Sequence, residues 1–126
     1  MIKYQILMAH NNYQVKNGMS IWHPFSHIMQ ISRKGEILGF IRYHTRFYQR
    51  NVVSLDWVET GLHQHPFAFR YLYDQFERFA RTKGYTKIEA LCHAYSLRLF
   101  EKLGFRVDDC ARSDIDPTLE AVVKEF

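Results

Sequence analysis

The fold is decided by the sequence VVSLDWVETGLHQHPFAFRYLYDQFERFARTKGYTKIEALCHAYSLRLFEKLGF, which runs from Val52 to Phe105. Its first seven residues, 52–58, are mostly β-branched or apolar and predict a buried strand. Thr60-Gly61 and His65-Pro66 end that strand, because proline lacks the backbone donor that a sheet requires and glycine frees the backbone. The stretch therefore opens as a strand followed by a turn.

After the turn, the apolar residues recur at three- and four-residue steps and predict a helix over 67–83 that ends at Gly84. A second short strand follows at 87–92, and then a second helix at 96–103 that ends at Gly104. A strand, a crossover helix and another strand within about 40 residues indicate a βαβ unit with parallel strands.

The composition is that of one globular domain covering residues 1–126, with 47% hydrophobic and 24% charged residues. No stretch reaches the roughly 18 apolar residues that a membrane span needs. The N-terminus lacks the pattern of a signal peptide, so we expect a cytoplasmic protein. Two cysteines, Cys92 and Cys110, are expected to be free thiols, and a net charge of +4 permits an anionic ligand without demanding one.

Outside the βαβ unit the pattern predicts mainly strands. We expect strands at 1–9, 28–33, 37–44 and 106–107, with Lys34-Gly35-Glu36 forming a hairpin turn. Residues 10–27 are the least regular, and Asn11-Asn12, Asn17-Gly18 and His23-Pro24 are turn signals. By propensity, residues 118–126 suit a helix or a strand equally.

The segment Arg42–Arg50 alternates cations with aromatic residues and is expected to form a turn. One interpretation is a connection whose long side chains lie over apolar surface. The other is an exposed contact surface for a protein partner, a second copy of this chain included. Nucleic acid is the less favoured partner because the net charge is small.

Residues 96–105, SLRLFEKLGF, resemble the Y-E-K-L-G-F segment of the GCN5-related N-acetyltransferase (GNAT) superfamily. Residues 79–88 resemble that superfamily's central helix, glycine stop and following strand, and GEILGF at 35–40 resembles its central hairpin. The resemblance implies an α/β (α+β) fold: a mixed, mostly antiparallel sheet of six or seven strands with helices on its faces. It also favours a strand over a helix for 118–126.

The resemblance further implies that acetyl-CoA binds in an opening between the strands 52–59 and 87–92. Pantetheine amides would pair with the backbone near Trp57 and Val58, and His93 stands where the family often has an asparagine beside the coenzyme. The family's pyrophosphate loop, R/Q-x-x-G-x-G/A, aligns with Gln64, Phe67 and Phe69. Two phenylalanines therefore stand in place of glycines, and His65 and Arg70 are candidates for compensating positive contacts.

For catalysis, the family's usual acid for the thiolate is a tyrosine at the position of Phe100, which cannot donate a proton. Tyr95 is the nearest substitute. Glu59 is the candidate base, and Asp56 points to the opposite face of the same strand by its two-residue period. The histidines at 63, 65 and 93 are weak evidence for a metal, and we expect none.

Two functions follow from these observations. The first is an N-acetyltransferase that moves an acetyl group directly from acetyl-CoA to an amine. The alternative is a catalytically inactive protein of the same fold that binds a protein or nucleic acid. The loss of the loop glycines and of the tyrosine favours the alternative, and the family resemblance favours the enzyme.

Overall fold

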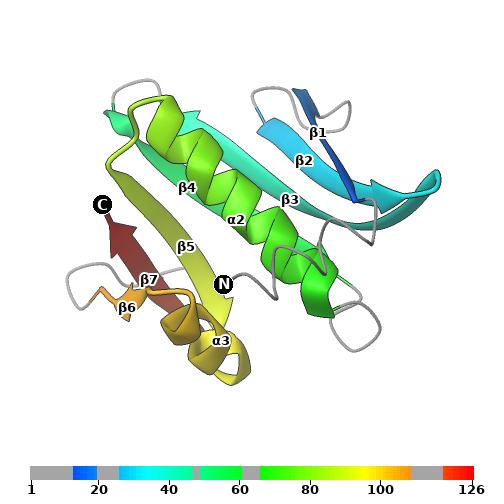
Figure 1. Ribbon diagram of the computed structural model, residues 1–126. Coiled ribbons are helices and arrows are strands. Elements are labelled where there is room, and N and C mark those ends of the chain that lie inside the picture. The colour runs from blue at the N-terminus through cyan, green and yellow to red at the C-terminus, as the bar shows by residue number, and fades with distance from the viewer. Residues whose placement is uncertain (1–12, 20–25, 47–48, 61–65, 109–117) are drawn as a thin grey trace. The chain divides into compact units, whose positions relative to one another are not determined.

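The computed structural model describes residues 13–19, 26–46, 49–60, 66–108 and 118–126 (Figure 1). Within these residues, seven strands form one sheet in the order β1-β2-β3-β4-β5-β7-β6. The elements are β1 (Gln14–Met19), β2 (Ser26–Arg33), β3 (Glu36–Arg46), β4 (Gln49–Thr60), α2 (Pro66–Thr82), β5 (Lys87–His93), the 3₁₀ helix η1 (Ala94–Ser96), α3 (Leu97–Lys102), β6 (Arg106–Val107) and β7 (Leu119–Glu125).

The predicted fold class is confirmed. β4 and β5 are neighbours and parallel, as the βαβ pattern predicts, whereas the pairs β1–β2, β5–β7 and β6–β7 are antiparallel. The terminal segment is a strand, and it lies between β5 and β6 (Figure 1). The strand predicted at 1–9 lies outside the described residues.

The chain divides into two compact units. The first unit comprises Met1–Tyr43 and Trp57–Phe79, and the second comprises His44–Asp56 and Ala80–Phe126. Among the described residues, no helix is long and apolar enough to cross a membrane.

In the first unit, α2 buries the apolar stripe that its sequence predicts. Leu72 and Phe76 are fully buried, and Tyr43 of β3 meets the rings of Phe76 and Phe79 with centroids 5.2 Å and 5.7 Å apart. The β2–β3 hairpin turns on Lys34 and Gly35, which both have positive φ (51° and 81°). Positive φ at both central residues is typical of the type I′ turn, whose twist matches that of the strands.

The turn predicted at Asn17-Gly18 is wrong, because both residues lie inside β1. That strand pairs with β2 over six residues, from Gln14↔Ser32 to Met19↔His27. Asn17 instead accepts a hydrogen bond from the Tyr43 hydroxyl at 2.6 Å. A partner strand and a partner for its side chain outweigh the weak local preference of Asn-Gly for a turn.

The turn predicted at Arg42–Arg50 is also corrected. β3 continues to Arg46 and β4 begins at Gln49, so residues 42–46 are strand. Tyr43, one of the aromatic residues of the proposed contact surface, is 2% exposed and belongs to the core. Phe47 and Tyr48 lie outside the described residues.

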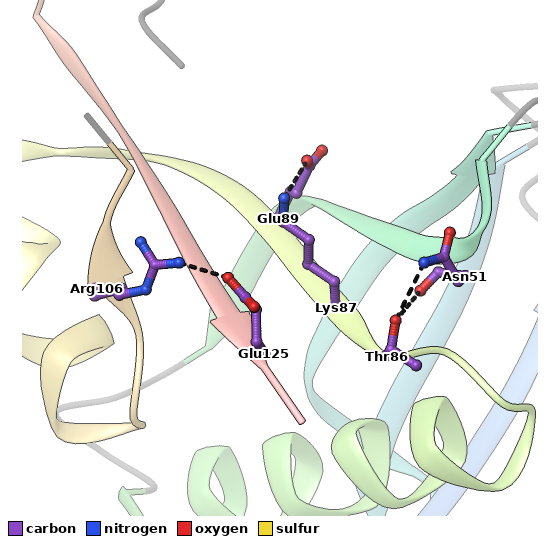
Figure 2. Close-up of polar contacts among 6 residues, drawn as sticks. All are labelled: Asn51, Thr86, Lys87, Glu89, Arg106 and Glu125. Carbon is purple, nitrogen blue, oxygen red and sulfur yellow. Dashed lines mark hydrogen bonds and ion pairs between the residues drawn. The ribbon is translucent and has the colours of Figure 1, made fainter. Parts of the chain in front are cut away.

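In the second unit, the parallel pair β4–β5 is held firmly where it begins (Figure 2). The backbone N–H of Thr86 donates to the carbonyl oxygen of Asn51 at 2.8 Å, and the Asn51 amide donates to the Thr86 hydroxyl at 3.2 Å. The backbone N–H of Phe126 donates to the Thr86 carbonyl at 2.9 Å. Thr86 is therefore bonded both to the start of β4 and to the end of the chain.

The helices α2 and α3 end in the same way, at the predicted glycines. Gly84 (φ 89°) donates to the Arg81 carbonyl, and Tyr85 donates to the Ala80 carbonyl at 3.0 Å. Gly104 (φ 99°) donates to Glu101, and Phe105 donates to Phe100 at 3.0 Å. This bond pattern is the Schellman motif, which needs a left-handed residue and therefore favours glycine.

The end of α3 is additionally bonded to the terminal strand. Lys124 of β7 donates from Nζ to the Leu103 carbonyl at 2.7 Å. A Cβ atom on Gly104 would lie 3.0 Å from Cε and Nζ of that lysine. The position therefore disfavours a side chain by its backbone conformation and by its neighbour.

We predict that Gly104→Ala lowers the free energy of unfolding by about 1–2 kcal/mol, because alanine would occupy a left-handed conformation. Urea unfolding followed by tryptophan fluorescence would measure the change. Gly18→Ala is the matched control, since its Cβ would meet nothing within 4 Å. Equal destabilisation by the two substitutions would contradict the assignment.

A second prediction concerns Cys92, a free thiol that is 5% exposed in β5. Burial, and secondarily the negative charge of Glu120 opposite it on β7, raises the pKa of this thiol. At pH 8 less thiolate is present than in an exposed cysteine, so in a Cys110→Ser variant the native protein should react with Ellman's reagent at least ~10-fold more slowly than the unfolded protein.

Glu120→Gln should speed that native reaction, because it removes one cause of the raised pKa. Glu125→Gln, on the same strand, is the control and should not change the rate. The prediction is wrong if Glu125→Gln accelerates the reaction as much as Glu120→Gln does.

Candidate active site

The parallel ladder of β4 and β5 stops well before either strand ends. Four residue pairs connect the strands, from Val52↔Lys87 to Leu55↔Ala90. β4 continues to Thr60 and β5 to His93, and the last residues of β5 pair with β7 on its other side, up to His93↔Leu119. Beyond Leu55 and Ala90, no pairing of β4 with β5 is present among the described residues.

In the first unit, the sequence-predicted coenzyme residues lie at the end of β4 and at the start of α2. Trp57 is 50% exposed and Val58 is half-buried. Phe67 is exposed, whereas Phe69 is buried. Gln64 and His65 lie outside the described residues.

The structure changes the interpretation of the two phenylalanines. α2 begins at Pro66, so Phe67 and Phe69 lie in its first turn and not in an extended loop. The first-turn N–H groups of a helix have no intrahelical partner, and this is true of any residue in helical conformation. The backbone freedom of glycine is therefore not required at these two positions. Phe69 is buried and belongs to the core.

Arg70 follows directly on α2 and is largely exposed. Its Nε lies 3.5 Å from Oδ1 of Asp74, one turn further along the helix. The side chain of Arg70 is 58% exposed, so this pair is screened by solvent and holds the arginine weakly. The cation stays accessible near the N-terminal end of α2.

In the second unit, the structure brings His93 and Tyr95 together just beyond β5. Their rings are stacked, with centroids 5.0 Å apart and planes 9° apart, and Tyr95 is 84% exposed. Phe100, at the position of the family's tyrosine, is buried and meets Phe105 edge to face with centroids 5.3 Å apart. Phe100 is a core residue, which leaves Tyr95 as an accessible hydroxyl at this end of β5.

Of the two carboxylates on β4, the structure describes the contacts of Asp56. Nδ1 of His44 lies 2.8 Å from Oδ1 and 2.7 Å from Oδ2 of Asp56. The backbone of Glu59 belongs to β4, but its side chain lies outside the described part of the structure. The sequence did not reveal the pair of His44 and Asp56, because their approach depends on the register of two strands.

No group of three histidine, cysteine or acidic side chains within the described segments is placed to hold a metal ion. Cys92 is an unsuitable nucleophile, since burial disfavours its thiolate. The chemistry available in the second unit is therefore that of His44, Asp56, His93 and Tyr95, near the end of the β4–β5 ladder.

No family model matches the sequence, and no curated protein matches it. Solved structures do match. An acetyltransferase from Bacillus subtilis in complex with CoA superimposes with a TM-score of 0.69 at 14% identity, covering 91% of this chain and 99% of that one. A GNAT family acetyltransferase from Elizabethkingia anophelis with acetyl-CoA bound gives 0.71 at 12% identity, covering 92% and 99%.

The PaiA N-acetyltransferase from Thermoplasma acidophilum, in complex with coenzyme A, gives a TM-score of 0.64 at 17% identity. The match covers 79% of this chain and 60% of that one, so this chain spans about three-fifths of the length of that structure. At sequence identities of 12–17%, these matches establish the fold and not the activity. The chain has the fold of the GCN5-related N-acetyltransferases.

Proposed function

We propose that residues 1–126 form an N-acetyltransferase domain that transfers an acetyl group directly from acetyl-CoA to an amine. The observation that carries this proposal is the early end of the β4–β5 ladder at Leu55↔Ala90. Unpaired strand backbone offers hydrogen-bond donors and acceptors to an extended, amide-containing ligand such as pantetheine. Structures of this fold with CoA or acetyl-CoA bound support the choice of ligand.

The residues that would hold the coenzyme have distinct tasks. The backbone of Trp57 and Val58 would pair with pantetheine amides, and the first-turn N–H groups of α2 would bind the pyrophosphate. Arg70 would add a positive charge, as would His65, and Gln64 would add polar contacts. His93 would lie beside the coenzyme.

The reaction requires proton transfer at two atoms. The acceptor amine must lose a proton before its nitrogen attacks the thioester carbon, and the departing sulfur must gain one. Tyr95 is the proposed donor to the sulfur, because it is exposed and stacked on His93. Glu59 is a candidate base on the unpaired half of β4.

The alternative function is a protein-binding or nucleic-acid-binding module that has lost catalysis. Phe100 favours it, because the position that carries an acid in the family is here a buried apolar ring. In that case the chain would keep the fold and bind no acetyl-CoA. Coenzyme binding therefore separates the two functions.

We predict that acetyl-CoA raises the melting temperature of the protein, since a ligand that binds the folded state alone stabilises it. Isothermal titration calorimetry should show that Arg70→Ala weakens binding about five- to tenfold, as expected for an exposed charged contact to phosphate. Arg78→Ala is the matched control, because it removes an equal charge from an exposed position of α2, two turns further on.

Thiol release from acetyl-CoA, measured with a panel of primary amines, then tests the transfer step. If millimolar acetyl-CoA leaves the melting temperature unchanged, the binding-module function replaces the enzyme. Equal weakening by Arg70→Ala and Arg78→Ala would mean that net charge, and not a site at the start of α2, attracts the coenzyme. Glycine substitution at Phe69 is unsuitable for these tests, because it would empty part of the core.

A further inference from the structure

His44 and Asp56 form a short contact whose chemistry fixes the position of one proton. An ionised carboxylate only accepts hydrogen bonds, so the ring nitrogen that faces it must donate. Nδ1 of His44 lies 2.8 Å and 2.7 Å from the two carboxylate oxygens. The ring proton is therefore on Nδ1, and in the neutral ring Nε2 keeps its lone pair.

The contact is too well formed to be an incidental surface pair. The side chains of His44 and Asp56 are 36% and 24% exposed. Lys87 and Glu89, in the same unit, have comparable exposure (31% and 26%) and lie 3.5 Å apart (Figure 2). The nitrogen–oxygen distance of the His44–Asp56 pair is thus much shorter than that of the Lys87–Glu89 pair at similar burial. The His44 ring is still accessible to a small molecule.

The position of the pair links it to the end of the ladder. Asp56 is the residue directly after Leu55, the last residue of β4 that pairs with β5. His44, on β3, and Asp56 belong to the same compact unit as that ladder. The pair therefore stands where the backbone of β4 loses its partner.

We propose that His44, in place of Glu59, is the base that deprotonates the acceptor amine and that Asp56 is a positioning residue for its ring. This inference rests on the proposed function. Nε2 of His44 takes one proton from the acceptor ammonium. The freed nitrogen attacks the thioester carbon, a C–N bond forms and the C–S bond breaks. Sulfur leaves with the bonding electrons and takes a proton from the Tyr95 hydroxyl. The second proton of the nitrogen replaces the one that Tyr95 gives up, and His44 releases the first proton to solvent.

The test combines three variants of the full chain. His44→Gln should lower the rate of thiol release from acetyl-CoA with ethanolamine or spermidine as acceptor at least ~100-fold, which is typical of a lost general base. Its dissociation constant for acetyl-CoA should stay within about twofold. Asp56→Asn should lower the rate about 10-fold or more, through the orientation of the ring. Glu89→Gln, which removes the comparable pair, should leave the rate unchanged.

Two further measurements separate a base from a merely structural histidine. Added imidazole should restore part of the rate to His44→Ala and none to Asp56→Asn, since only the first variant leaves room for it. In the wild-type protein, long-range ¹H–¹⁵N spectra at the pH of the assay should show the His44 proton on Nδ1 and none on Nε2. This measurement needs neither substrate nor a folded variant.

The outcomes are distinct. Acetyl-CoA binding with a rate within threefold of wild type in His44→Gln overturns the role of His44 and leaves the proposed function intact. A proton on Nε2 of His44 in the spectra also overturns that role, even if the variants fail to fold. Absence of acetyl-CoA binding, or of any thiol release, in the wild type overturns the proposed function and the base together.

Discussion

The parallel ladder between β4 and β5 is the contact on which the arrangement of the second unit depends. It is held at its start, where Thr86 bonds to Asn51 on one side and to Phe126 on the other. β7 then pairs with β5 along all seven of its residues. β7 therefore holds β5 as a strand up to His93, although the pairing with β4 ends at Ala90. The ladder is therefore reinforced by extra hydrogen bonds where it begins, and the pairing stops at Leu55↔Ala90.

Two identical helix ends place the elements that follow. At Gly84 and Gly104 the chain leaves a helix within one residue and begins a strand two or three residues later. The left-handed glycine conformation allows so sharp an exit. The strands that follow pair from Val52↔Lys87 and from Arg106↔Val123. Lys124 adds a bond from β7 to the end of α3, so the terminal strand secures the helix as well as the sheet.

Much of this fold could be predicted from sequence, because its signals are local. The helical period of α2, the two glycine stops and the apolar strand at 52–58 each depend on residues near in the chain. Strand pairing is different. Asn17-Gly18 is locally typical of a turn, yet it lies in a strand, because β2 supplies partners along its whole length. Tyr43 belongs to a segment whose mixture of arginines and aromatic residues is typical of a contact surface, but its ring packs against α2.

The candidate site was less predictable for the same reason. Tyr95, His93 and Arg70 were found by resemblance, and their exposure suits the roles proposed for them. The approach of His44 to Asp56 joins residues twelve apart on two strands, and a shift of one residue in register would send them to opposite faces. No local sequence pattern predicts the approach of His44 to Asp56. The replacement of the family's tyrosine by Phe100, in contrast, could be read directly from the sequence.

Under the proposed function, the two proton transfers differ in difficulty, and the loss of that tyrosine affects the easier one. An alkyl amine has a pKa of about 10.4, whereas an alkyl thiol such as that of cysteine has a pKa of about 8.5. At neutral pH the amine must therefore be deprotonated against a larger free-energy difference than the thiolate faces in leaving unprotonated. The base at the acceptor is the more demanding part of the machinery. Under the proposed function, Tyr95 takes over the less demanding proton transfer from the position of the buried Phe100, and the histidine held by Asp56 at the end of the β4–β5 ladder takes the harder step.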